Sequence, residues 1–144
     1  MAKSVSRSGD LNLRLMRVAR AHRSVAASLL SKVDLHPGQD ALLMELWEED
    51  GRTQVNLAAA LGVEPPTVTK MLQRMEASKL IARRPDKVDR RAIRVHLTPK
   101  GRRLKAKVDD IWAELEAHTV EGLSDRQQAS LRSLLGTLET NLES

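Results

Sequence analysis

Cysteine, phenylalanine and tyrosine do not occur among the 144 residues of this chain, and tryptophan occurs only twice. Without cysteine, the chain forms no disulfide bond, senses no oxidant through a thiol and offers zinc no cysteine ligand. The scarcity of aromatic rings argues against a protein that binds single-stranded nucleic acid, because such proteins stack bases on aromatic side chains.

Long hydrophobic runs are also absent. No apolar stretch is long enough to span a membrane, and residues 1–8 lack the apolar core of a signal peptide. We therefore expect a cytoplasmic protein with no membrane partner. With 41% hydrophobic and 30% charged residues, the chain has the composition of a globular protein. Its length suits one compact domain, which we expect to comprise residues 1–144.

Motifs that would indicate catalysis are missing as well. The sequence has no glycine-rich phosphate loop and no Ser, His and Asp set that spacing ties together. The four histidines show no metal-ligand spacing, so neither a metal nor a cofactor is expected. The sequence therefore does not predict an enzyme.

What the chain has in excess is positive charge, with a net charge of +5 and a pI of about 10.0. Residues 79–107 hold twelve of the 24 Lys and Arg residues and only two acids, Asp86 and Asp89. A solvated cationic surface could have the same composition. We favour a surface that contacts DNA phosphates, because a helix face without acids precedes this segment.

That helix belongs to the segment 54–98, whose pattern predicts helix, turn, helix, strand, basic loop and strand. Thr53 suits the cap of the first helix and Gly62 suits its end, and the prolines at 65 and 66 suit the start of the second. Apolar residues at helical spacing mark the buried side of the second helix. Its opposite face carries Pro66, Thr67, Thr69, Lys70, Gln73 and Arg74.

Residues 93–97 alternate between apolar and polar side chains, as in a half-buried strand, and residues 80–82 are a plausible partner strand. The basic loop 83–91 would form the tip of the hairpin. A helix-turn-helix followed by such a hairpin is a winged helix-turn-helix, which places its second helix in the major groove of DNA. The hairpin is called the wing, and its tip reaches the DNA backbone or the minor groove.

Long helices are expected on both sides of this segment. The first would span about residues 10–32, capped by Ser8 or Asp10 after a tail of residues 1–8. A second helix would span 37–50. After the hairpin, the hydroxyl of Thr98 would cap a long helix over 99–121, and Ser124 would cap the last helix. The apolar stripes of the first and last helices are too broad to be buried against a small winged lobe alone.

The run 89–101 has an Asp, an Arg two residues later and a Leu-Thr pair that closes the strand. This run resembles the wing signature of the MarR family of transcriptional regulators, and the resemblance extends over the segment 35–103. The other matching residues are Leu57-Ala58, Leu61-Gly62-Val63, Thr67-Val68-Thr69-Lys70 and Leu35-His36-Pro37 with Gln39.

The resemblance implies a mainly α fold with a small β-hairpin wing, in which residues 10–34 and 99–143 form a dimerisation region and 37–98 the DNA-binding lobe. It also implies a homodimer that binds a pseudo-palindromic site on double-stranded DNA, as a repressor released by a small-molecule effector. Two alternatives stay open: an architectural dimer that coats DNA without an operator, and a protein-interaction module on the same scaffold.

Candidate DNA contacts follow from the two motifs. Gln73 or Arg74 would read bases, since Gln suits adenine and Arg suits guanine. Thr67, Thr69 and Lys70 would contact phosphates. In the wing, the resemblance places Arg91 in the minor groove, oriented by Asp89, although Arg90 could exchange roles with it. Arg83, Arg84 and Lys87 would contact the DNA backbone.

Two positions depart from the family pattern. Pro66 stands where the family often has a small hydroxyl residue, so one usual contact near the helix start is missing. Asp40 stands where the family commonly has an aromatic residue, which argues against its usual pocket for phenolic ligands. His22, on the apolar face of the first helix, is more often a core histidine than a ligand. By resemblance, His22 and His36 could line an effector pocket.

Overall fold

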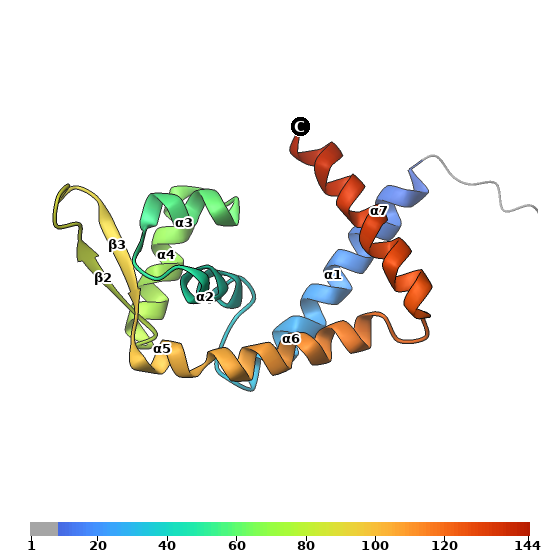
Figure 1. The fold of residues 1–144 in the computed structure, drawn as a ribbon, viewed down its shortest axis with the longest axis horizontal. Coiled ribbons are helices and arrows are strands. Elements are labelled where there is room, and N and C mark those ends of the chain that lie inside the picture. Colours follow the sequence, from blue (N-terminus) through green and yellow to red (C-terminus); the bar gives the residue numbers. More distant parts are fainter. Residues whose placement is uncertain (1–8) are drawn as a thin grey trace, which may run out of the picture.

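The structure, a computed structural model, describes residues 9–144; the expected tail 1–8 and the candidate cap Ser8 lie outside the described residues. Its elements are α1 (Asp10–Ser31), α2 (Gln39–Glu48), β1 (Arg52–Thr53), α3 (Gln54–Leu61), α4 (Pro65–Ala77), β2 (Ile81–Pro85), β3 (Ile93–Leu97), α5 (Pro99–Arg103), α6 (Lys105–Thr119) and α7 (Asp125–Glu143). A compact lobe of α2–α4 and the sheet lies at one end, and α1, α6 and α7 extend away from it (Figure 1). The predicted mainly α fold with a winged helix-turn-helix is confirmed.

Local capping explains where the helix-turn-helix begins and turns. The Thr53 hydroxyl accepts a hydrogen bond from the amide of Asn56 and caps α3. Gly62 ends α3 in the left-handed conformation, with φ of 64°, which a glycine adopts without steric cost. Helix α4 then begins with two prolines, whose missing amide protons would have no intrahelical partner there. The turn between the helices is therefore set by the local sequence.

The sheet has three antiparallel strands in the order β1-β3-β2. Strand β2 is longer than the predicted segment 80–82 and pairs with β3 from Ile81 opposite Leu97 to Pro85 opposite Ile93. Strand β1 was not predicted, because two residues are too few to show a period of two. It joins the start of α3 to the wing, with Arg52 opposite Val95.

The helix predicted over residues 99–121 is two helices, α5 and α6, separated by Leu104. Leu104 keeps helical dihedral angles, and α5 leads directly into α6 in Figure 1. Thr98 caps α5 by accepting from the amide of Gly101, as its sequence predicts. Gly101 is buried, and a Cβ atom there would lie 2.2 Å from the carbonyl oxygen of Leu80. The backbone just before β2 and the backbone of α5 therefore lie so close together that only glycine fits at position 101.

The start of α1 differs from its prediction. Gly9, with φ of 85°, occupies the cap position, and no side chain caps the helix. Asp10 is the first helical residue and pairs with Arg14 one turn later (3.0 Å). A carboxylate in the first turn interacts favourably with the helix dipole, so Asp10 stabilises this end without capping it.

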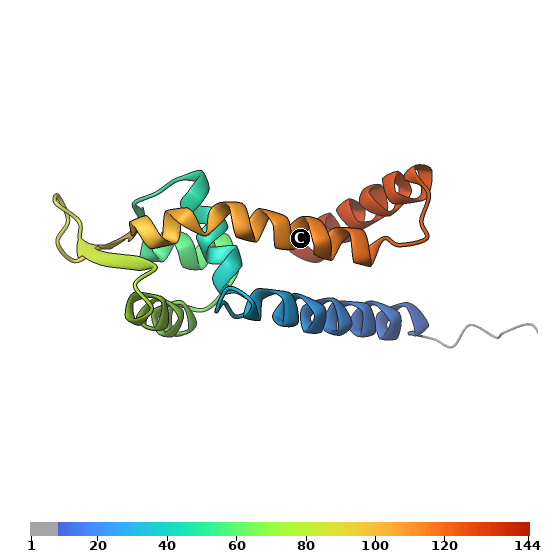
Figure 2. The same cartoon turned by 90° about the horizontal axis from the view of Figure 1, so that it is seen from below.

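One hydrophobic core joins the lobe to the long helices. Its members come from the end of α1, from α2–α4, from β2 and β3, and from α6. Helix α1 contributes only its last turns, and α7 contributes no buried residue. Figure 2 shows α1 along one side of α6, and Figure 1 shows that α7 turns back from the end of α6. Leu11 is 81% exposed and Leu142 is 76% exposed, so much of the apolar stripes of the terminal helices is left uncovered by residues 9–144.

Candidate nucleic-acid interface

Helix α4 presents a polar face to solvent. Its apolar side is anchored by Val68, Leu72 and Met75, which are fully buried. The opposite side exposes the predicted contact residues Thr67, Lys70, Gln73 and Arg74, together with Pro66. Among these side chains there is no carboxylate, so the face offers hydrogen-bond donors and positive charge to a polyanion.

Thr69 lies apart from this set. It is half-buried, and its hydroxyl donates to the carbonyl of Pro65 (3.0 Å) and accepts from the side chain of Gln54 (2.8 Å). These bonds occupy the hydroxyl predicted to meet a phosphate. Gln54, the first residue of α3, is a residue that the sequence did not single out. The bond fixes how α3 and α4 lie against each other.

The tip of the wing is held by Asp86. One of its carboxylate oxygens accepts from the amides of Val88 (3.1 Å) and Asp89 (2.8 Å), and the other accepts from the guanidinium of Arg94. The hydrogen bond from Arg94, followed by that from Asp89, lowers the pKa of Asp86 from 3.8 to about 2. Arg94 also donates to the carbonyl oxygen of Gly51 (2.8 Å). This cluster was not predicted from the sequence, although an Asp whose side chain accepts hydrogen bonds from the backbone amides two and three residues later is a known turn former.

Asp89 and Arg91 contact each other as the wing signature implies. Arg91 Nε lies 3.2 Å from Asp89 Oδ1, and the Arg91 amide donates to the same oxygen (3.1 Å). The Arg91 side chain is 93% exposed, so it is free to enter a groove. Arg91 also lines a hollow of 350 Å³ with Pro65 at the start of α4, which places the wing beside the helix-turn-helix. Whether Arg90 or Arg91 enters the minor groove stays a prediction.

The remaining wing cations differ in their surroundings. Arg83 is half-buried and pairs with Glu76 of α4 (3.3 Å), and this hydrogen-bonded contact lowers the pKa of Glu76. Arg83 therefore fastens the wing to α4. Arg84, Lys87 and Arg90 are exposed and form no ion pair within residues 9–144.

The structure separates the two histidines proposed for an effector pocket. His36, just before α2, lines a hollow of 230 Å³ together with Thr67, Lys70 and Arg74 of α4. His22 lies far from it on α1 and lines another hollow with Trp112. The expectation that His22 is a core histidine is wrong within residues 9–144: His22 is exposed, although it lines hollows with Trp112 and Leu115 of α6.

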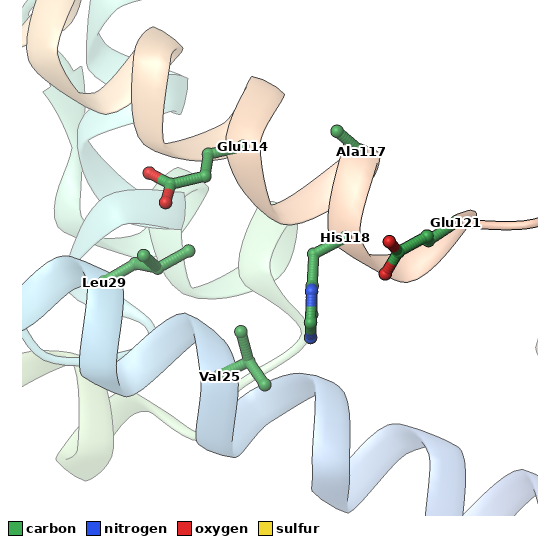
Figure 3. Close-up of a pocket in the computed structure, with 6 residues that line it drawn as sticks. All are labelled: Val25, Leu29, Glu114, Ala117, His118 and Glu121. Atoms are coloured by element: carbon green, nitrogen blue, oxygen red, sulfur yellow. The ribbon is translucent and has the colours of Figure 1, made fainter.

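A different histidine faces the space between α1 and α6. His118 points from α6 toward Val25 of α1, with Glu114 of the same helix on one side and Glu121, in the turn after α6, on the other (Figure 3). These side chains and Leu29 line a hollow of 510 Å³. The described residues contain no group of three or more His, Asp or Glu side chains placed to hold a metal ion.

Asp40, the departure from the family aromatic, has a structural partner. It is 6% exposed and accepts from Trp112 Nε1 of α6 (3.0 Å) and from the amide of Gly38 (3.0 Å). The other tryptophan forms a second link between the same parts, because Trp47 Nε1 of α2 donates to the carbonyl of Gly101 (3.0 Å). Both indole N–H groups therefore fasten α2 to the rod formed by α5 and α6.

None of the helices within residues 9–144 has the length and apolar character needed to cross a membrane.

Comparisons with known proteins agree with this geometry. The family model described as "MarR family" matches residues 35–93. The HTH-type transcriptional regulator TtmR of Methylorubrum extorquens (strain PA1) is 36% identical over 119 residues, which are 83% of this chain. The chain spans about half (56%) of the length of that relative.

A second relative is matched over more of its own length. The organic hydroperoxide resistance transcriptional regulator of Bacillus subtilis (strain 168) is 35% identical over 80% of this chain and 75% of its own. Among solved structures, the transcriptional repressor CouR bound to a 23-mer DNA duplex superposes with a TM-score of 0.86 and 28% identity, covering 96% of this chain and 99% of that one. The chain therefore belongs to the MarR family of DNA-binding transcriptional regulators.

Proposed function

We propose that this chain is a transcriptional repressor that binds a pseudo-palindromic site on double-stranded DNA as a homodimer. Residues 10–34 and 99–143 would form the dimerisation region, and residues 37–98 the DNA-binding lobe. Helix α4 would enter the major groove, and the wing would lie against the neighbouring minor groove.

The observation that carries this proposal is the polar face of α4 beside a basic wing. Thr67, Lys70, Gln73 and Arg74 are exposed together with no acid among them. Glu76, in the last turn of α4, is engaged by Arg83. In the wing, both acids are engaged by arginines of the wing, so they shape the tip while several cations stay exposed. This charge arrangement suits a phosphate backbone.

Unpartnered apolar faces support the homodimer. The terminal helices expose Leu11, Leu134 and Leu142, each more than 60% accessible in the single chain. Continuous apolar surface of this kind on a globular protein is usually covered by another chain. A second copy would cover both helices at once and would place two copies of α4 on one side of the dimer, which is the arrangement that a palindrome requires.

Repression and its release are the finer parts of the proposal. CouR is described as a repressor and was solved on a 23-mer duplex, which is long enough for two half-sites one helical turn apart. The hollow between α1 and α6 lies where α1 meets the rod that carries the lobe (Figure 3). A small molecule bound there would lower the affinity of the protein for DNA by a certain factor. Bound DNA would lower the affinity of the protein for the small molecule by the same factor.

The deciding experiment is to select bound fragments from random DNA. We expect two half-sites about 10 bp apart and at least about 10³-fold tighter binding to the selected duplex than to random duplex of the same length. The logarithm of affinity should also fall linearly with the logarithm of salt concentration. A ratio near one would support the architectural alternative, and absence of binding would support a protein-interaction module.

A further inference from the structure

We propose that the hollow between the start of α2 and the polar face of α4 seats a phosphate of the DNA backbone, with His36 as a ligand of that phosphate. The inference rests on the proposed function and deepens it, because it assigns a binding role to a histidine outside the helix-turn-helix. It also assigns Arg74 to the backbone, which leaves Gln73 as the base-reading residue of α4.

The lining of the hollow suits an anion. Lys70 and Arg74 stand one turn apart on α4, with Thr67 one turn before Lys70, and His36 faces them from the segment before α2. No carboxylate lines the hollow. Three groups that carry or can carry positive charge, and one hydroxyl, therefore converge from two separate elements on a space of 230 Å³.

His36 is held in place by its neighbours rather than by a flexible loop. Its amide donates to the side chain of Gln39 (3.0 Å), and its carbonyl accepts from the amide of Gln39 (3.0 Å). Gln39 is 7% exposed, so this pair of bonds is fixed by burial. Gly38 lies against Met71 of α4: a Cβ atom added to Gly38 would lie 3.6 Å from the terminal methyl group of Met71. The imidazole is thus carried on a backbone that is already ordered against α4.

The acids near His36 do not compete for these cations. Asp34 and Asp40 belong to the same segment, and neither lines the hollow. Asp40 is buried and bonded to Trp112 and to the amide of Gly38. An anion from outside the chain is therefore the natural partner, and DNA supplies one, because the hollow is continuous with the face of α4 that enters the major groove.

Histidine changes charge between pH 5 and 8, and a bound phosphate favours its charged form. DNA binding should therefore tighten as pH falls from 8 to 6, through one added contact. The added contact should be the same on any sequence, because phosphates carry no base identity.

The test compares the whole wild-type protein with His36→Gln, His36→Lys and the control Arg126→Gln. Arg126 is an exposed cation of α7 outside the DNA-binding lobe. Affinity is measured by fluorescence anisotropy at pH 6 and pH 8, between 50 and 200 mM salt, on the selected duplex and on random duplex. Thermal melting of each protein checks that the fold is intact.

We expect His36→Gln to lower the salt slope at pH 6 by about 0.9 on both duplexes and to leave it unchanged at pH 8. Across this salt range, the ratio of wild-type to variant affinity would fall by about 3.5-fold. His36→Lys should keep the wild-type slope of pH 6 at both pH values. Arg126→Gln should behave as wild type.

Two outcomes would overturn the phosphate seat while leaving the proposed function intact. In one, His36→Gln retains the pH dependence and slope of the wild type on both duplexes. In the other, it weakens only the selected duplex, which would make His36 a base-reading residue. Equal affinity of the wild type for both duplexes would instead remove the sequence-specific repressor function and leave the seat standing.

Discussion

The carboxylate of Asp86 and the guanidinium of Arg94 join the tip of the wing to its second strand. Asp86 also receives the amides of Val88 and Asp89, and Arg94 also reaches the carbonyl of Gly51. The tip, β3 and the turn before β1 are thereby linked through two side chains. The exposed cations of the tip are consequently carried on a turn that is ordered before any DNA arrives.

Because the tip is already ordered, Asp86→Ala should weaken DNA binding, although it removes a negative charge. The substitution removes a negative charge from the DNA side of the protein, so charge alone would tighten binding. We expect binding to weaken by about 2- to 12-fold, because Arg90 and Arg91 would then have to be ordered on binding. Asp89→Ala should weaken it less, since Asp89 engages only Arg91. Anisotropy titrations against Asp109→Ala, which removes an acid outside the wing, provide the check; tighter binding for Asp86→Ala would refute the argument.

The same carboxylate predicts how the wing responds to acid. Because the pKa of Asp86 in the folded protein is lowered to about 2 from 3.8, the ionised form is favoured by folding. Its stabilising effect is complete above about pH 4 and is lost as pH falls through 2. The amide resonance of Val88 should therefore stay constant from pH 8 to 4.5 and titrate near pH 2. Asp86→Asn should abolish this titration; a midpoint near 4 would show that the Arg94 contact is not formed.

Gly101 predicts a large loss of stability from a small change. In Gly101→Ala the new methyl would lie 2.2 Å from the carbonyl of Leu80, and backbone cannot rotate away as a side chain can. Separating α5 from β2 would also strain the bond from Trp47 to Gly101. We expect the free energy of unfolding, measured in urea, to fall by about 1–3 kcal/mol. Arg103→Ala, at an exposed position of the same helix, should stay within about 0.5 kcal/mol of wild type.

The parts of the fold that the sequence predicted well are those fixed by neighbouring residues. Thr53, Gly62, Thr98 and Ser124 each act within three or four residues, and each ends or starts a helix where predicted. The alternation of residues 93–97 likewise identified the central wing strand, because its period of two needs only five residues to show.

What could not be predicted depends on contacts between distant residues. Strand β1 exists only because β3 lies beside it, and the break at Leu104 leaves no proline or glycine as a signal. The bond from Trp112 to Asp40 spans 72 residues, and no local pattern contains it. Asp86 and Arg94 lie eight residues apart in sequence, and pairing them requires the register of the hairpin. His36 was placed with His22 by resemblance, whereas the fold places it beside Lys70 of α4.

The exposed leucines predict the oligomeric state. Leu138→Asp combined with Leu142→Asp should shift the protein from a dimer toward the 16.0 kDa monomer in light scattering, because two charges cannot be buried against a partner helix. Val88→Asp is the matched control: Val88 is 95% exposed, but it lies on the wing. That variant should remain dimeric even if it binds DNA less tightly. A wild-type protein that is monomeric at micromolar concentration would contradict the proposed dimer.

The last prediction divides the two neighbouring polar residues of α4. Gln73→Ala should relax the preference for one base in each half-site, at a cost of about 1–3 kcal/mol on the selected duplex and almost nothing on random duplex. Arg74→Ala should weaken binding to both duplexes alike and lower the salt slope by about 0.9, because its guanidinium faces the hollow shared with His36. Repeating the selection from random DNA with each variant distinguishes the two effects: a changed base at one position for Gln73→Ala, and an unchanged site for Arg74→Ala. If the site changes for Arg74→Ala instead, Arg74 contacts a guanine, and the backbone contact in the hollow falls to His36 and Lys70 alone.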